Sequence, residues 1–117
     1  MARPTARART TRTPALRLVL TTVPPRRAAA VARALVAERT AACVNVVRGV
    51  RSVYRWRGRV HDDSEALLVV KTTRGGLPRC LAALAALHPY DVPEIVVLTP
   101  AAVGAAYDAW ARASSGP

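Results

Sequence analysis

The richest chemistry in this sequence lies in the seven-residue run His88-Pro89-Tyr90-Asp91-Val92-Pro93-Glu94. Proline fixes its own φ and restricts the residue before it, so a segment with two prolines is stiff and holds its polar groups in place. His88 could also cap free carbonyls at the end of a helix, and Asp91 could fix the turn by accepting hydrogen bonds from backbone amides. The run predicts a binding loop whose candidate residues are His88 and Glu94 as metal ligands and Tyr90 and Asp91 as cleft residues.

Cysteine is the other residue type with metal chemistry, and the chain has two, Cys43 and Cys80. Thiolate sulfur suits Cu(I), whereas imidazole suits Cu(II) or zinc. A lone cysteine also behaves as a small buried hydrophobe, and both interpretations stay open for Cys43. Cys80 falls on the apolar face of an expected helix and is assigned to the core. Two cysteines without metal-motif spacing indicate no disulfide framework and favour a reduced, cytoplasmic setting.

Aromatic and basic residues gather around Tyr54 and Trp56, which lie two apart and therefore share one face of a strand. Such a mixture can stack nucleic-acid bases, but Tyr, Trp and Arg are also the types enriched in protein interfaces. We favour a subunit interface. Lys71 ends an apolar strand, where its ammonium either reaches outward to water or is paired, and we favour pairing at a cleft between subunits.

Composition narrows the class of protein further. The chain has 117 residues, enough for one domain, and carries 18 Lys and Arg against 7 Asp and Glu. Four of the arginines lie in residues 1–14, which we expect to be a disordered tail, and Lys71 is the only lysine. This distribution argues against a selected nucleic-acid surface. No apolar stretch is long enough for a membrane span.

Periodicity predicts seven elements between residues 15 and 113, which form a single domain. Strands are expected at 16–22, 43–56, 60–72 and 94–98. Helices are expected from Pro25, with Ala28, Val31 and Leu35 on its apolar face, from Leu77 to His88, and at 101–113. The order β-α-β-β-α-β is that of a ferredoxin-like α+β fold, an antiparallel sheet with two helices on one face, here with an added C-terminal helix. Gly49 is expected to mark a bulge or bend. The second face of the sheet is left for a partner subunit to cover.

The motifs together resemble the CutA family, the divalent-ion-tolerance proteins. The matching pieces, in order, are Ala41-Ala42-Cys43-Val44-Asn45, Ser52-Val53-Tyr54, Trp56-Arg57-Gly58, Ser64-Glu65, Val70-Lys71-Thr72, the His88–Glu94 run, Tyr107 and Trp110. The resemblance implies a homotrimer built by strands of neighbouring subunits. It also implies a role in tolerance of copper and other divalent cations, with Cys43 as the leading copper ligand. The donor types in the loop make His88 or Glu94 the expected further contributors.

The same architecture is similar to PII-type signalling proteins, so an alternative is a trimer that binds a small molecule or a protein partner at clefts between subunits. The residues expected to line such clefts are Lys71, Tyr90, Asp91, Glu65 and Glu94. The sequence has no glycine-framed serine, no phosphate loop and no histidine with an obvious Ser or Cys partner. We therefore expect a binding protein and not an enzyme.

Overall fold

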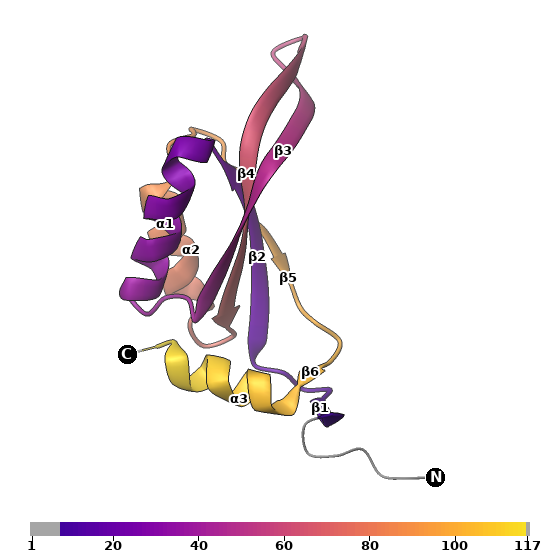
Figure 1. Ribbon diagram of the computed structural model, residues 1–117, viewed down its shortest axis with the longest axis vertical. Helices are drawn as coiled ribbons and strands as arrows, with labels where there is room; N and C mark the ends of the chain where they lie inside the picture. Colours follow the sequence, from indigo (N-terminus) through magenta and orange to yellow (C-terminus); the bar gives the residue numbers. More distant parts are fainter. Residues whose placement is uncertain (1–7, 117) are drawn as a thin grey trace.

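The computed structural model describes residues 8–116, and a four-stranded antiparallel sheet lies at its centre (Figure 1). The strands are β2 (Leu16–Val23), β3 (Cys43–Trp56), β4 (Arg59–Thr73) and β5 (Val96–Leu98), in the order β3-β4-β2-β5. This order and the α/β alternation confirm the predicted α+β, ferredoxin-like fold.

Two helices, α1 (Pro25–Ala37) and α2 (Leu77–Leu87), cover the same face of the sheet (Figure 1). A proline stands in the first turn of each helix, where the missing amide hydrogen bond does no harm. Small and branched residues on one stripe of α1 and α2 pack on alternate residues of β2 and β4. The buried core so formed contains Val19, Val23, Ala28, Val31, Leu35, Ala41, Ala66, Leu68, Val70, Cys80 and Leu84.

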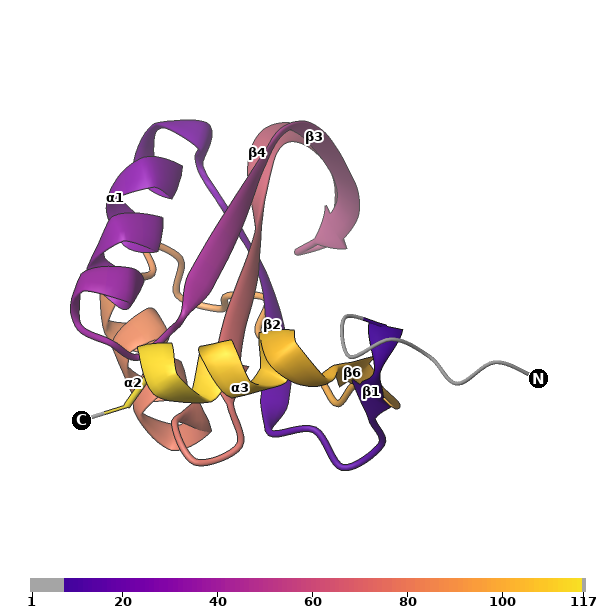
Figure 2. The same cartoon turned by 60° about the horizontal axis from the view of Figure 1, so that its bottom comes forward.

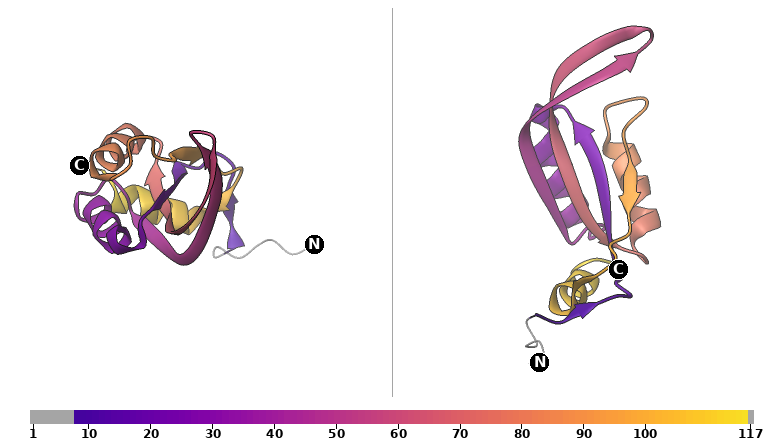
Figure 3. Two further views of the ribbon diagram at one scale, coloured as in Figure 1. Left: turned by 90° about the horizontal axis from the view of Figure 1, so that it is seen from above. Right: turned by 90° about the vertical axis from the view of Figure 1, so that its right-hand side faces the viewer.

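Beyond the sheet, β3 and β4 continue as a long hairpin, which we call the arm (residues 50–65) and which Figures 1 and 3 show projecting from the body. Arg57 and Gly58 form the tight turn at its tip, with φ values of 52° and 77°. The register shifts between Val47 and Val50, where Gly49 has φ of 77°, so the predicted bulge is present. Beyond the bulge the arm curls over (Figure 2).

The C-terminal helix α3 (Ala105–Ser114) crosses the end of the sheet opposite the arm tip (Figures 2 and 3). It begins later than predicted, because Val103 and Gly104 form a short strand, β6, instead of a first helical turn. Tyr107 and Trp110 lie on its exposed side, while Asp108 and Ala111 are its buried residues. The helical spacing of Val103, Tyr107 and Trp110 therefore does not mark the packed face of this helix.

The expected boundary of the N-terminal tail also differs in the structure. Residues 1–7 lie outside the described part of the chain, but Thr10–Thr11 form a strand, β1, that pairs antiparallel with β6. The amide of Ala105 also donates to the carbonyl of Arg9 at 2.9 Å. Backbone hydrogen bonds need no apolar side chains, which is why composition alone placed this segment in the disordered tail.

Among the described residues, α3 covers one end of the face of the sheet away from α1 and α2, where Leu18 packs against the cluster of Leu16, Ala42 and Ala111. The rest of this face carries exposed apolar side chains, and we call it the open face. Register places Cys43, Lys71, Leu18 and Leu98 in one row across this face. Side chains at its edges, such as Val47, Val96 and Leu98, are about 42–43% exposed. None of the helices in residues 8–116 is long and apolar enough to cross a membrane.

Candidate functional site: a cleft between the arm and the proline-bounded loop

The proline-bounded loop 88–94 faces the base of the arm across a cleft of about 880 Å³. The loop contributes Pro89 to Val92 and Glu94, and β3 contributes polar and aromatic side chains from the arm. The remaining lining comes from Glu65 of β4 and Thr22 of β2. The full set is Thr22, Arg51, Ser52, Val53, Tyr54, Trp56, Arg57, Glu65, Pro89, Tyr90, Asp91, Val92 and Glu94.

His88 fixes the loop to the sheet with both of its ring nitrogens. Nδ1 accepts from the backbone amide of Tyr90 at 3.2 Å, so the ring proton is on Nε2. Nε2 lies 3.0 Å from the carbonyl of Thr22 and 3.0 Å from the hydroxyl of Thr21. Burial lowers the pKa of His88, against the smaller opposing effects of the Thr22 carbonyl and the Glu65 charge. The imidazole is therefore a neutral structural link whose two nitrogens are already occupied.

Tyr90 and Glu65 connect the loop to β4 inside the cleft. The phenol of Tyr90 donates to Oε2 of Glu65 at 2.8 Å. Burial, and then the bond to Glu65, raises the pKa of Tyr90 far above its usual value, so the phenol keeps its proton. The Glu65 side chain is buried, with 6% exposure, and this hydrogen bond satisfies one of its oxygens. The pair forms the polar back of the cleft and leaves Asp91 and Glu94 on its exposed rim.

On the arm, the two aspartates are each paired with a side chain of β3. The phenol of Tyr54 donates to Asp63, a bond that raises the pKa of Tyr54, and its ring stacks on His61 with centroids 5.2 Å apart. Arg51 forms an ion pair with Asp62. These contacts orient the arm side chains, and they account for the carboxylates of the arm without any bound ion.

The aromatic tip of the arm is open to solvent in the protomer. Trp56 is 44% exposed, and the guanidinium of Arg57 lies 5.6 Å from its ring. Tyr54 is 42% exposed. Large exposed aromatic side chains beside arginine have the composition of an interface, as expected for these residues.

Cys43 and Lys71 lie at the other end of the sheet from the cleft. They are direct partners across β3 and β4, and the Lys71 ammonium lies 5.7 Å from the ring of Tyr107 on α3. Lys71 is six residues from Glu65 along β4, or on the order of 20 Å. Of the five residues predicted to line clefts, four line one cleft within a single chain and Lys71 does not; the four are Glu65, Tyr90, Asp91 and Glu94.

The three predicted metal ligands are also separated within one protomer. Cys43 is on the open face, whereas His88 contacts the side chain of Thr21, which belongs to the helix-covered face. Glu94 lies on the rim of the cleft. In residues 8–116, no three side chains of His, Cys, Asp or Glu converge as a metal-binding group. Sequence spacing could not show this, because the three residues belong to separate segments whose relative positions are set by the tertiary fold.

Two residues with defined roles escaped sequence reasoning. Arg51 lines the cleft and is fixed by Asp62, but in an arginine-rich chain nothing distinguished it. Asp108 accepts hydrogen bonds from the amides of Ala15 and Leu16, at 3.1 and 2.8 Å, and so joins α3 to the start of β2. An isolated acid in an otherwise apolar and basic helix was the only available signal.

A ferredoxin-like chain with a protruding β-hairpin arm, and with a sheet face that α3 covers at one end, defines the structural class of this protein. The sequence profile described as "CutA1 divalent ion tolerance protein" matches residues 17–114, and the chain belongs to this family. Among curated relatives, "Divalent-cation tolerance protein CutA" of Thermus thermophilus is 50% identical over 100 residues, covering 85% of this chain and 97% of that protein. "Protein CutA, chloroplastic" of Arabidopsis thaliana is 46% identical over 82 residues, covering 69% of this chain and 45% of that protein.

Solved structures agree with this assignment. CutA from Synechococcus elongatus superposes with a TM-score of 0.89 at 38% identity, covering 96% of this chain and all of that one (100%). The "PII-like protein CutA" from Nostoc sp. has a TM-score of 0.81 at 33% identity, covering 86% of this chain and 97% of the other.

Proposed function

We propose that this chain forms a cytoplasmic, non-enzymatic homotrimer that binds copper or other divalent cations and contributes to metal tolerance. Membership of a divalent-ion-tolerance family supports the general role. Two free cysteines are consistent with a reduced compartment. The observation that carries the proposal is the open face, which exposes apolar side chains at its edges and contains the half-buried Cys43.

The open face supports assembly because it exposes a contiguous apolar surface on a small protein. Val96 and Leu98 continue the surface across β2 to the edge strand β5, and the aromatic arm extends it at the other end. Surfaces of this kind mark protein interfaces when they exceed the patches normal for monomers. A second and third copy of the chain are the proposed cover, and Tyr54 and Trp56 are the proposed anchors at the interface.

The proposed metal site is completed between protomers. Within one described protomer the candidate donors do not converge, so a site with several ligands needs donors from more than one chain. Cys43 is half-buried at the edge of the open face and is the proposed main ligand, since a thiolate favours Cu(I). Glu94 of a neighbouring protomer is the proposed second donor. His88 would contribute only after losing its bonds to Thr21, Thr22 and Tyr90.

Native mass spectrometry of the purified protein, with and without Cu(I) under reducing conditions, tests subunit number and bound metal together. We expect a trimer and a copper stoichiometry that falls strongly in Cys43→Ser. Cys80→Ser is the matched control, because that thiol is fully buried on α2. Thiolate-to-copper charge-transfer absorption should follow the same order, and affinity should fall at low pH because binding displaces the thiol proton. Unchanged copper binding in Cys43→Ser would refute the assigned ligand, and a monomer would refute the assembly.

A second candidate function is that of a PII-like signalling trimer, and the cleft favours it. About 880 Å³ is enough for an organic ligand, and the lining combines aromatic rings with both signs of charge. The proposed contacts are Tyr90, Asp91 and Glu65, with Lys71 of a neighbouring protomer. Tyr90→Phe removes the hydroxyl but keeps the ring, so it should weaken binding of an organic ligand while copper binding persists. Cys43→Ser should have the reverse effect, and this contrast separates the two functions.

A further inference from the structure

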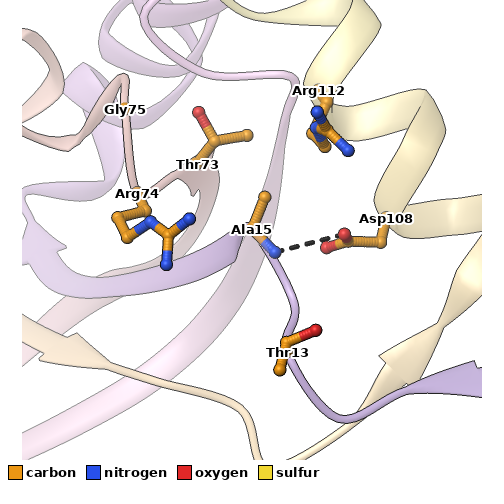
Figure 4. A pocket seen from close by; sticks show the side chains of 7 residues that line it. All are labelled: Thr13, Ala15, Thr73, Arg74, Gly75, Asp108 and Arg112. Carbon is orange, nitrogen blue, oxygen red and sulfur yellow. Dashed lines mark hydrogen bonds between the residues drawn. The ribbon is translucent and has the colours of Figure 1, made fainter.

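A second pocket lies at the end of the molecule opposite the arm tip, between the β4–α2 turn, α3 and the segment that leads into β2. It has a volume of about 390 Å³ and is lined by Thr13, Ala15, Thr73, Arg74, Gly75, Asp108 and Arg112. Figure 4 shows the side chains of Arg74 and Arg112 reaching it from two separate elements. This pocket shares no residue with the cleft beside the proline-bounded loop.

The pocket carries positive charge that its own residues do not neutralise. Its two guanidinium groups face a single carboxylate, that of Asp108. Both oxygens of Asp108 are used by the amides of Ala15 and Leu16, as Figure 4 shows for Ala15. Among the described residues, neither Arg74 nor Arg112 has a carboxylate within ion-pair distance.

The arginines are also held by fixed backbone. The amide of Arg74 donates to the carbonyl of Ala15 at 2.7 Å, directly beyond the last pairs of the β2–β4 ladder. Arg112 lies one helical turn after Asp108, whose two hydrogen bonds hold α3 against the sheet. The fold therefore sets the backbone positions from which the two side chains reach the pocket, and both side chains are exposed.

A hydroxyl donor completes the polar lining. Thr73 is 9% exposed, and its oxygen accepts from the amide of Gly76 at 3.2 Å. No acceptor for the Thr73 hydroxyl proton occurs among residues 8–116, so this proton remains available to a ligand. Gly75 adds no side chain, and a Cβ placed there would meet no atom within 4 Å.

From this arrangement we propose that the pocket binds a small oxyanion of the phosphate class. Guanidinium groups match the oxygens of phosphate in paired, charge-assisted hydrogen bonds, and two of them from separate elements neutralise a dianion. Arg74, Arg112 and the hydroxyl of Thr73 are the assigned contacts. A bound anion would bridge the β4–α2 turn and α3 and hold the C-terminal helix in place. The proposal stands independently of metal or cleft binding, since those sites use other residues.

Isothermal titration calorimetry of the full chain with inorganic phosphate tests the proposal, with ionic strength held constant by chloride to remove general screening. The variant is Arg74→Gln/Arg112→Gln, and the matched control is Arg26→Gln/Arg33→Gln, which removes the same charge from the exposed side of α1. We expect saturable binding by the unmodified protein and the control, and affinity at least about tenfold weaker in the pocket variant. Absence of saturable binding, or equal losses in both double variants, would overturn the proposal.

Two further experiments test the assigned contacts and the kind of anion. Arg74→Lys keeps the charge but loses the planar fork, so it should fold normally and bind phosphate more weakly than the unmodified protein; unchanged binding would contradict the assigned contact. Glycerol phosphate then identifies the source of the anion. Affinity equal to that of phosphate assigns the site to phosphorylated small molecules, and much weaker binding assigns it to free phosphate.

Discussion

Asp108 provides the sharpest test of how this fold is held together. Its carboxylate is 7% exposed and accepts hydrogen bonds from the amides of Ala15 and Leu16. These two bonds fix the first turn of α3 to the entry of β2, ninety-two and ninety-three residues away in the chain. Asp108→Ala removes both acceptors and leaves the amides without partners.

The size of the effect follows from the burial of each bond. The bond to Leu16 is buried, and losing a charged partner there costs about 1.5–3 kcal/mol. The bond to Ala15 is only partly buried, so water recovers much of it and its loss costs roughly 0.5–1 kcal/mol. An acid in the first turn of a helix adds about 0.3–1 kcal/mol through the helix dipole. We expect Asp108→Ala to lower the free energy of unfolding by about 2–5 kcal/mol, a large part of the usual total.

Chemical denaturation measures the global change, and hydrogen exchange locates it. The amides of Ala15 and Leu16 should lose protection more than amides in the centre of β2. Asp91→Ala is the control, since that carboxylate is exposed and accepts no hydrogen bond from the described residues. A change below about 1 kcal/mol, or exchange that rises uniformly along β2, would show that α3 is held by apolar packing and not by Asp108.

Three other perturbations follow from the structure. Burial lowers the pKa of His88, so below about pH 6.5 the unfolded chain binds more protons than the folded chain. The free energy of unfolding should therefore fall as the pH drops through that range. In denaturation experiments at several pH values, His88→Gln should flatten this dependence and His61→Gln should not. Trp56→Ala should weaken assembly by about 2–4 kcal/mol in analytical ultracentrifugation, whereas Val36→Ala on α1 should not, and an intact trimer would exclude Trp56 as an anchor. Deleting residues 1–13 removes β1 but no core residue, so assembly should persist and calorimetry should record a Tm lower by only a few degrees.

Most of the sheet could be predicted because its strands carry strong local signals. β-branched residues and alternation located β2, β3 and β4 within one or two residues, and the position of Gly49 indicated the bulge. The start of α3 was harder, because Val103 continues the helical spacing of Tyr107 and Trp110 while its backbone pairs with β1. That pairing joins segments some ninety residues apart, and nothing local to either segment encodes it.

In the candidate site, too, some features could be predicted from local sequence and others depend on the tertiary fold. Two prolines predicted a rigid loop, and the loop does hold Tyr90 and Asp91 at a cleft with Glu65. The use of both His88 nitrogens by the protein could not be read from the sequence, because their partners lie on β2 and at Tyr90. The nearby acids in the sequence therefore made His88 resemble a metal ligand, whereas in the fold its ring holds the loop against β2.

The separation of Cys43 from the other donors leads to one more prediction, which links metal binding to assembly. In the register of the sheet, Cys43 lies level with Leu18 of β2, whereas His88 contacts the carbonyl of Thr22, four residues or about 13 Å further along β2. His88 also contacts the side chain of Thr21, which lies on the helix-covered face. No side-chain rotation in one protomer joins these groups, so a multi-donor copper site requires neighbouring chains. Copper affinity should then fall together with assembly in Trp56→Ala, although Trp56 offers no metal ligand. Titration of Cu(I) across the concentration range in which that variant dissociates measures the linkage. Full affinity in a dissociated protomer would show that Cys43 binds copper without a partner, and the site would then be independent of the trimer.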